Sequence, residues 1–175
     1  YMSEQYRVMI VDDEAINRTL LRGILEDKGF DIIEADSGRK GLEMALSEQP
    51  DLIMLDVVMP DADGFAVCQE LRSVEETCAI PVVFITVLDN RFSILKALRA
   101  GATDYIIKPI EASDVITKVE GLLSTRNLVR DKINLLRIND AMISRIKVML
   151  SQFSAIEKVD DIKSDLAEKS MSTLD

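Results

Sequence analysis

The sequence predicts an α/β protein with a doubly wound parallel sheet, followed by a long α-helical or coiled-coil extension. Three observations support this fold class: short apolar runs rich in β-branched residues, longer segments of helical spacing between them, and a proline-free C-terminal part with a seven-residue apolar repeat. The runs are Arg7 to Val11, Phe30 to Ala35, Asp51 to Leu55, Pro81 to Thr86 and Asp104 to Lys108. Strands that are apolar throughout are covered on both faces, and the helices between them provide that cover. We therefore expect one compact domain of βα units over residues 6–124.

The segments between the runs carry apolar residues on one helical face. These residues are Ile16, Leu20, Leu21, Ile24 and Leu25, then Leu42, Ala45 and Leu46, then Phe65, Val67, Cys68 and Leu71, and finally Ile94, Leu95 and Leu98. The boundary residues agree with this division. Gly29 and Gly101 follow the first and fourth helices, Ser37 opens the second helix, and Pro50 closes it. The spacing predicts helices that pack on the sheet by these faces.

Composition and charge exclude several classes of protein. The content of 47% hydrophobic and 30% charged residues is typical of a globular protein, and no apolar stretch is long enough to span a membrane. We therefore expect a cytoplasmic protein without membrane contact. Residues 1–124 carry 12 Lys and Arg against 23 Asp and Glu, so this acidic part would repel nucleic acid phosphates. The chain has no histidine, which excludes imidazole catalysis and a phosphohistidine of its own.

Polar residues follow or end four of the predicted strands. Asp12 and Asp13 follow the first, Asp56 follows the third, Thr86 ends the fourth and Lys108 ends the fifth. In open parallel sheets these strand ends lie at one edge, where ligands bind. Carboxylates brought together there repel one another, and a hard divalent cation such as Mg²⁺ relieves the repulsion. With a lysine and a hydroxyl nearby, the set suits a phosphoryl group, and Asp56 is the candidate nucleophile for an aspartyl phosphate.

The motifs at these strand ends resemble those of a known family. The stretches "VMIVDDE", "LIMLDVVMPDADG", "PVVFIT" and "AGATDYIIKP" are similar to the receiver domain of two-component response regulators, of the chemotaxis-regulator type, over residues 6–124. The resemblance implies a flavodoxin-like (βα)5 sheet of strand order 2-1-3-4-5. It also implies a chain that is no enzyme in the ordinary sense. Its chemistry would be to accept phosphate from a histidine kinase, a phosphotransfer protein or a small donor, and to lose it slowly to water.

The resemblance assigns a role to each acidic residue. Asp56 matches the phosphoacceptor, Asp13 matches a direct Mg²⁺ ligand, and Asp12 matches the neighbouring acid that holds metal-bound water. The backbone carbonyl of Val58 would complete the metal shell.

Three further positions match the residues that respond to the phosphoryl group. Lys108 matches the ammonium that pairs with it, and Thr86 matches the hydroxyl that moves to bond it. Tyr105 matches the aromatic ring that swings inward as Thr86 moves. The bond between Lys108 and Pro109 resembles the family's cis peptide, a conformer that only X-Pro bonds adopt readily.

The sequence departs from the family pattern beside the acceptor. Val58 and Leu88 stand where many relatives have polar side chains, and Val87 replaces a very small residue next to Thr86. Our hypothesis is that this apolar cover slows hydrolysis of the aspartyl phosphate and narrows access for small donors.

The C-terminal part predicts a helical dimerisation or signalling segment over residues 125–159. Leu122, Val129, Leu136, Ile143 and Leu150 repeat every seven residues, flanked by Leu128, Leu135, Met142, Met149 and Ile156. We expect one helix from Ala112 to about Ile156 that pairs in a homodimer; a hairpin bent near Asn139 and Asp140 is the alternative. Residues 160–175 are polar, so we expect a frayed tail there and an output domain outside this chain.

Two alternative functions remain from sequence alone. A phosphatase that passes through an aspartyl phosphate should carry a second acid two residues after the nucleophile, where this chain has Val58. A pseudo-receiver that acts only as a protein-binding module would leave Asp56 unphosphorylated, and a failure to bind Mg²⁺ would support it.

Overall fold

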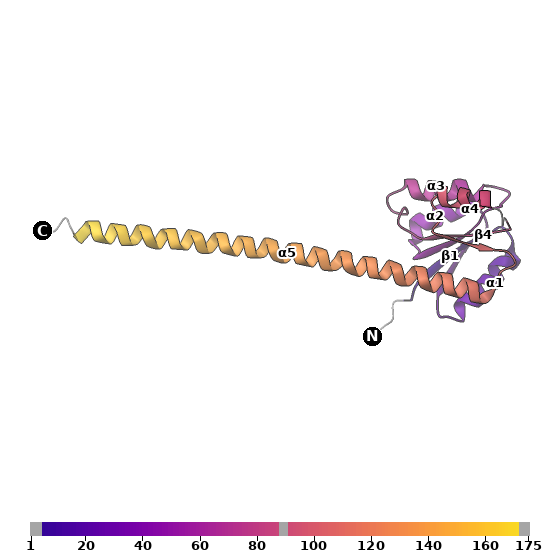
Figure 1. Ribbon diagram of the computed structural model, residues 1–175, viewed down its shortest axis with the longest axis horizontal. Helices are drawn as coiled ribbons and strands as arrows, with labels where there is room; N and C mark the ends of the chain where they lie inside the picture. The colour runs from indigo at the N-terminus through magenta and orange to yellow at the C-terminus, as the bar shows by residue number, and fades with distance from the viewer. Residues whose placement is uncertain (1–4, 88–90, 172–175) are drawn as a thin grey trace. The chain divides into compact units, whose positions relative to one another are not determined.

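The structure is a computed structural model that describes residues 5–87 and 91–171, with side chains described for residues 5–87 and 95–151. Strands and helices alternate along the chain (Figure 1). The elements are β1 (Arg7–Val11), α1 (Ala15–Glu26), β2 (Asp31–Ala35), α2 (Gly38–Glu48), β3 (Leu52–Asp56), α3 (Gly64–Ser73), β4 (Val82–Thr86), α4 (Arg91–Arg99), β5 (Asp104–Ile107) and α5 (Ala112–Met171).

The strands form one parallel sheet of order β2-β1-β3-β4-β5, so the predicted fold class is confirmed. The three central strands are buried almost throughout, whereas β2 and β5 are edge strands with half-buried residues. The expectation of full cover on both faces therefore holds for the centre of the sheet only.

Each face of the sheet has its own hydrophobic core. Alternate residues of β1 divide between them: Met9 and Val11 pack with residues of α2, α3 and α4, while Val8 and Ile10 pack with α1 and the first turns of α5. Val115, Val119 and Leu123 of α5 are buried in the second core. The helices thus cover the two faces of the sheet, and the loops that carry the polar residues lie at its carboxyl edge.

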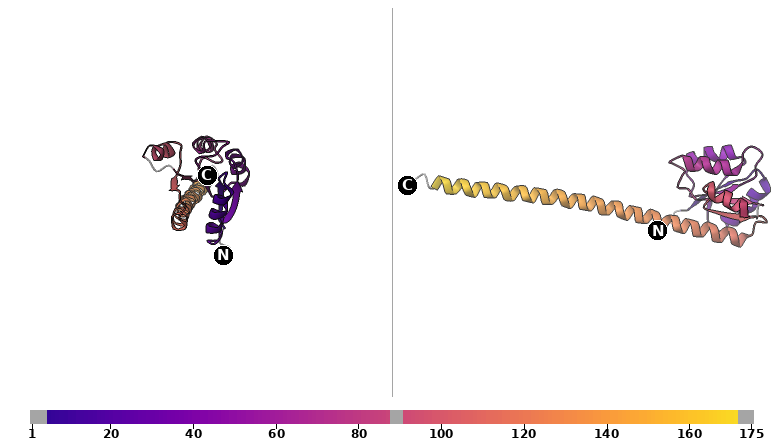
Figure 2. Two further views of the ribbon diagram at one scale, coloured as in Figure 1. Left: turned by 90° about the vertical axis from the view of Figure 1, so that its right-hand side faces the viewer. Right: turned by 45° about the horizontal axis from the view of Figure 1, so that its top comes forward.

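The chain divides into two compact units, residues 1–125 and residues 126–175. The second unit is helical to Met171 and belongs to α5, which is a single helix of 60 residues (Figure 2). The expected end near Ile156 is therefore wrong, and so is the hairpin near Asn139 and Asp140. The fraying expected for residues 160–175 stays a prediction, with residues 172–175 outside the described part. In the described residues no helix combines the length and the apolar character that a membrane crossing requires.

The helical stripe predicted for α1 is only partly correct. Leu21 and Leu25 are fully buried and Ile24 packs against the core, but Ile16 is 82% exposed and Leu20 is 45% exposed. These two residues lie on the solvent side of α1.

Candidate functional site

Three carboxylates meet at the carboxyl edge of the sheet, as the strand ends predicted. One oxygen from each of Asp12, Asp13 and Asp56 lies within 4.8 Å of the others. Their meeting follows from the sheet, because β1 and β3 are neighbours and Val11 pairs with Leu55. Asp12 and Asp56 are 0% and 4% exposed, so two of the three acids are removed from water.

Asp12 is held by several donors. The backbone N–H of Glu14 donates to Oδ1 over 2.8 Å, and Asn17 Nδ2 donates to Oδ2 over 3.0 Å. Burial raises the pKa of Asp12, and the charge of Asp56 adds to the rise, although the Glu14 hydrogen bond and Lys108 oppose it. The charged form of Asp12 is therefore less favourable in this cluster than it is in water.

Lys108 brings the one ammonium that the described residues place in this cluster. Its Nζ lies 3.1 Å from Asp56 Oδ2 and 3.7 Å from Asp12 Oδ2. Burial alone would lower the pKa of Lys108, but the hydrogen bond to Asp56 and the charges of Asp56 and Asp12 raise it by more. Lys108 follows β5 directly and begins a cis bond to Pro109, as expected.

The donor set fits a magnesium ion. Three carboxylates against one ammonium leave excess negative charge in a mostly buried space, and all available ligand atoms are oxygens. Asp13 and Asp56 would hold the ion directly, and Asp12 would hold water bound to it. The proposed fourth group, the carbonyl of Val58, lies in the loop after β3, where the Val58 N–H donates to Asp56 Oδ1 over 3.4 Å.

Gly64 closes this loop against the acceptor strand. Its N–H donates to the Val57 carbonyl over 2.9 Å. A Cβ at position 64 would overlap the Asp56 carbonyl oxygen and lie 2.8 Å from Val57 Cα. Only glycine permits this approach of α3 to the residue that follows the acceptor.

Thr86 and Tyr105 lie on the two strands beyond β3. Thr86 ends β4 and is 7% exposed, and its neighbour in β5 is Ile107. Tyr105 is half-buried against the core on the α4 side, with Lys118 Nζ 5.4 Å from its ring centroid.

The apolar residues beside the acceptor are exposed. Val58 is 61% and Val87 is 62% exposed, so neither side chain is part of the core. Leu88, the third predicted departure, lies outside the described residues.

Sequence reasoning missed Asn17 and Arg18 of α1. Asn17 contacts the Asp12 carboxylate, and Arg18 donates to the backbone carbonyls of Asp12 and Asp13. No sequence signal marks them, because polar residues one turn into a helix are ordinary surface residues in most sequences.

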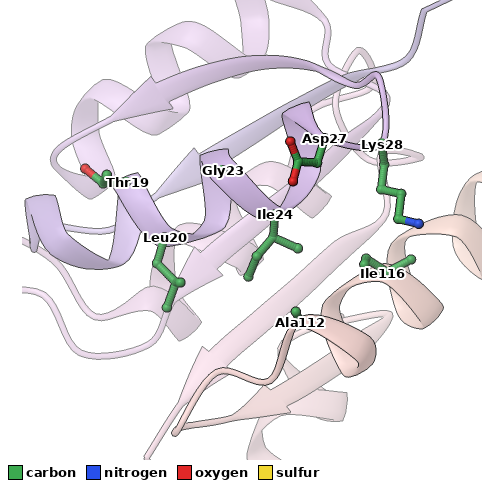
Figure 3. A pocket seen from close by; sticks show the side chains of 8 residues that line it. All are labelled: Thr19, Leu20, Gly23, Ile24, Asp27, Lys28, Ala112 and Ile116. Carbon is green, nitrogen blue, oxygen red and sulfur yellow. The ribbon is translucent and has the colours of Figure 1, made fainter.

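A groove runs between α1 and the first turns of α5 (Figure 3). Leu20, Ile24, Ala112 and Ile116 provide its apolar lining, and its volume is about 400 Å³. It is separate from the acidic cluster and shares Leu20 with the exposed side of α1.

Comparison with known proteins places the similarity in the first unit. The profile of the response regulator receiver domain matches residues 8–120. The transcriptional regulator RpaA of Synechocystis, named as DNA-binding, is 40% identical over 67% of this chain and 48% of its own length. The response regulator PleD of Caulobacter vibrioides is 40% identical over 66% of this chain and 26% of its own length. The chain thus spans half or less of these two relatives.

A solved structure agrees with the sequence matches. The crystal structure of a two-component response regulator from Clostridium difficile has a TM-score of 0.66 and 33% identity. It is similar over 70% of this chain and 99% of its own chain.

Proposed function

This chain belongs to the response regulator receiver domain family, and we propose that it accepts a phosphoryl group on Asp56 and passes the signal on through α5. The observation that carries the proposal is the set of neighbours of Asp56: its carboxylate lies within 4.8 Å of those of Asp12 and Asp13, and the Lys108 ammonium lies 3.1 Å from its Oδ2. A module that only bound proteins would have no need of this buried and electrostatically costly cluster.

The proposed reaction is the transfer of phosphate from a partner's phosphohistidine, or from a small acyl phosphate, to Asp56. A carboxylate oxygen of Asp56 forms the new bond to phosphorus, and the histidine nitrogen or acyl oxygen leaves with the electron pair. Mg²⁺ bound by Asp13, Asp56 and the Val58 carbonyl would neutralise charge on the phosphoryl oxygens. Lys108 would pair with one of those oxygens and thereby exchange its carboxylate partner for the phosphoryl group.

Thr86 and Tyr105 are the proposed switch. The Thr86 hydroxyl would move to bond the phosphoryl group, and Tyr105 would then turn further into the space on the α4 side of the sheet. The position of Tyr105 supports this role, because its ring is half-buried against the core and lies on β5, the strand next to β4, which ends in Thr86.

Labelling with acetyl phosphate and Mg²⁺ tests the proposal. We expect peptide mass spectrometry to find one phosphoryl group on Asp56, and Asp56→Asn to abolish it. Asp36→Asn is the control, because Asp36 is an exposed acid that pairs with Lys40 on the surface. Label on another residue, or none, would refute phosphoryl acceptance and would favour the pseudo-receiver.

The phosphodonor protein is proposed to contact the exposed face of α1. Ile16 and Leu20 are large apolar residues on solvent, and they follow Asp13 by three and seven positions. Because α1 begins two residues after Asp13, a partner bound to its exposed face would lie close to the acidic cluster. Ile16→Glu should slow transfer from a cognate histidine kinase or phosphotransfer protein but leave labelling by acetyl phosphate unchanged. Equal loss with both donors would contradict the docking role.

A second copy of the chain is the proposed partner of α5. From Leu128 to Leu150 the helix exposes large apolar residues, among them the seven-residue series Val129, Leu136, Ile143 and Leu150. Such a face requires a partner in water, and a regular series of this spacing fits an identical helix.

Disulfide formation tests the pairing. In a Cys78→Ser background, Leu136→Cys and Ile143→Cys should each crosslink two chains, because both face the partner. Ile138→Cys is the control, since Ile138 lies on the opposite side of the helix and should stay reduced. Crosslinks at Ile138 alone, or a monomer in sedimentation at all concentrations, would dismiss the homodimer without affecting the labelling result.

A further inference from the structure

We propose that Arg18 is a positioning residue that aims the Asp13 carboxylate at the metal site, an inference that rests on the proposed Mg²⁺ site. One guanidinium nitrogen of Arg18 donates to two successive backbone carbonyls, that of Asp12 over 2.7 Å and that of Asp13 over 3.1 Å. Both carbonyls therefore turn to the same side of the loop between β1 and α1.

The peptide unit between Asp13 and Glu14 is held at both ends. Its carbonyl accepts from Arg18, and its N–H donates to Asp12 Oδ1 over 2.8 Å. Two such bonds fix the plane of a peptide unit and hence the direction in which the preceding Cα–Cβ bond points. The preceding residue is Asp13, a proposed direct ligand.

Asp13 depends on this arrangement more than its neighbours do. Asp12 accepts hydrogen bonds from Glu14 and Asn17, and Asp56 accepts from Lys108 and Val58. Within the described part of the chain, the Asp13 carboxylate accepts no hydrogen bond of its own. Its direction is therefore set by the backbone, and Arg18 is the side chain that holds that backbone.

Arg18 is itself fixed to the sheet. Its Nε lies 3.5 Å from Glu34 Oε2, and Arg22 pairs with the other Glu34 oxygen at 2.7 Å. Glu34 belongs to β2 and lies beside Ile10 of β1. The side chains of Arg18 and Glu34 are 17% and 20% exposed, so the contact is largely shielded from water. Through Arg18 the loop is thus tied to β2, the edge strand beside β1.

The sign of a mutational effect separates positioning from charge. If Arg18 acted only as a nearby positive charge, its removal would strengthen the binding of a dication. If it positions Asp13, its removal must weaken binding although a repulsive charge is lost. Arg22 provides the matched control, because it pairs with the same glutamate one helical turn later and is not bonded to the loop carbonyls in the described contacts.

The experiment is calorimetric titration of the full chain with Mg²⁺ alone, together with thermal unfolding of the metal-free protein. We expect Arg18→Ala to raise the Kd by about 10-fold, the lower end of the range for residues that support metal ligands. Arg18→Lys should recover part of the affinity, because a lysine can donate to one of the two carbonyls. Arg22→Ala should keep the wild-type Kd, although it removes the shorter of the two ion pairs to Glu34.

Each result decides the question. An unchanged or lower Kd for Arg18→Ala overturns the positioning role, whereas wild type that binds no Mg²⁺ overturns the metal site and this inference together. If Arg18→Ala does not fold, Glu34→Gln loosens Arg18 without removing it and should raise the Kd in the same direction. A Glu34→Gln variant with the wild-type Kd would then count against the proposal.

Discussion

Asp12 is a fully buried carboxyl group, and burial makes its charged form costly. It is 0% exposed, and burial together with Asp56 raises its pKa. Removing the charge should therefore stabilise the metal-free protein, because Asn keeps the shape and can still accept from Glu14. We expect Asp12→Asn to raise the free energy of unfolding by on the order of 1 kcal/mol without Mg²⁺ and to abolish most of the stabilisation by Mg²⁺. Urea unfolding with and without the ion measures both effects.

The same residue predicts a dependence on pH. A carboxyl group with a raised folded-state pKa favours folding in its protonated form, so its contribution is present at acid pH and lost as the pH rises through that raised pKa. Mg²⁺ needs the carboxylate, so the shift in Tm caused by Mg²⁺ should grow from acid to neutral pH. In Asp12→Asn this growth should be much smaller. A Mg²⁺ shift that is equally large at acid pH would contradict the role of Asp12.

Val58 gives a prediction about the lifetime of the phosphoryl group. The side chain is 61% exposed beside Asp56 and offers no hydrogen bond to an attacking water. Val58→Asn should shorten the lifetime several-fold, measured as loss of label after the donor is removed. Leu46→Asn is the control, because Leu46 is similarly exposed on α2, at 49%. Equal lifetimes in wild type and Val58→Asn would dispose of the apolar-cover hypothesis.

The sequence predicted which residues meet at the site better than it predicted the residues that support them. Asp12, Asp13, Asp56 and Lys108 were predictable because parallel strands bring their carboxyl ends to one edge, whatever the exact loops do. Arg18 was not predictable in this way, because its contact depends on where a helix places a long side chain relative to a loop. Such contacts follow from tertiary packing, which leaves no periodic trace in the sequence.

At the scale of elements, the turn from β3 to α3 is the most constrained. Gly64→Ala would put a methyl group against the Asp56 carbonyl and Val57 Cα, both of them backbone atoms that cannot move aside cheaply. We expect it to lower the free energy of unfolding by about 2 kcal/mol or more and to reduce labelling of Asp56. Gly23→Ala is the control: a methyl group at that position of α1 would lie within 4 Å of no atom outside the adjacent helix backbone, so it should stabilise by about 0.5–1 kcal/mol. Equal stabilities for the two variants would show that the loop relaxes freely.

The ends of helices were predictable from the sequence where one residue type is needed at the boundary. Ser37 caps α2 by accepting from the Lys40 N–H, and Gly29 and Gly101 adopt positive φ angles of 83° and 93° after their helices. Which side of a helix is buried was less predictable. Ile16 and Leu20 continue the helical spacing of Leu21 and Leu25, yet they lie on solvent, because a periodic pattern does not say which part of a broad stripe the sheet will cover. The end of α5 was predicted near Ile156 instead of Met171, because a polar helix and a frayed tail have a similar composition.

At the scale of the whole molecule, two units with different charge share one helix. Residues 1–125 have a net charge of -11, from 12 basic and 23 acidic residues, whereas residues 126–175 have +1, from 9 basic and 8 acidic residues. Two acidic units would repel each other, so the nearly neutral segment is the part suited to self-association. Its apolar series would supply affinity, while its polar residues would have to select one alignment among several that the seven-residue repeat permits.

Asn139 and Asp140 are the polar residues that could select it. They stand three and four positions after Leu136 and therefore flank the apolar series on opposite sides. In a parallel pair the two-fold axis runs along the helices, so Asn139 of one copy faces Asp140 of the other and can donate to its carboxylate. In an antiparallel pair centred at this level Asp140 would face Asp140, and in a parallel pair shifted by seven residues Asn139 would no longer face Asp140 of the other copy.

Replacing Asn139 by leucine should therefore strengthen the dimer but loosen its alignment. In a Cys78→Ser background, a chain with Leu136→Cys mixed with a chain with Ile143→Cys forms a mixed disulfide when a parallel pair shifts by one repeat, or when the helices pair antiparallel about Asp140, but not in the parallel pair in register. We expect little mixed product with Asn139 present and a clear increase with Asn139→Leu, together with dimers that persist at lower concentration in sedimentation. Asn134→Leu, on the far side of the helix, should change neither quantity. An unchanged crosslinking pattern in Asn139→Leu would show that the apolar residues alone fix the alignment.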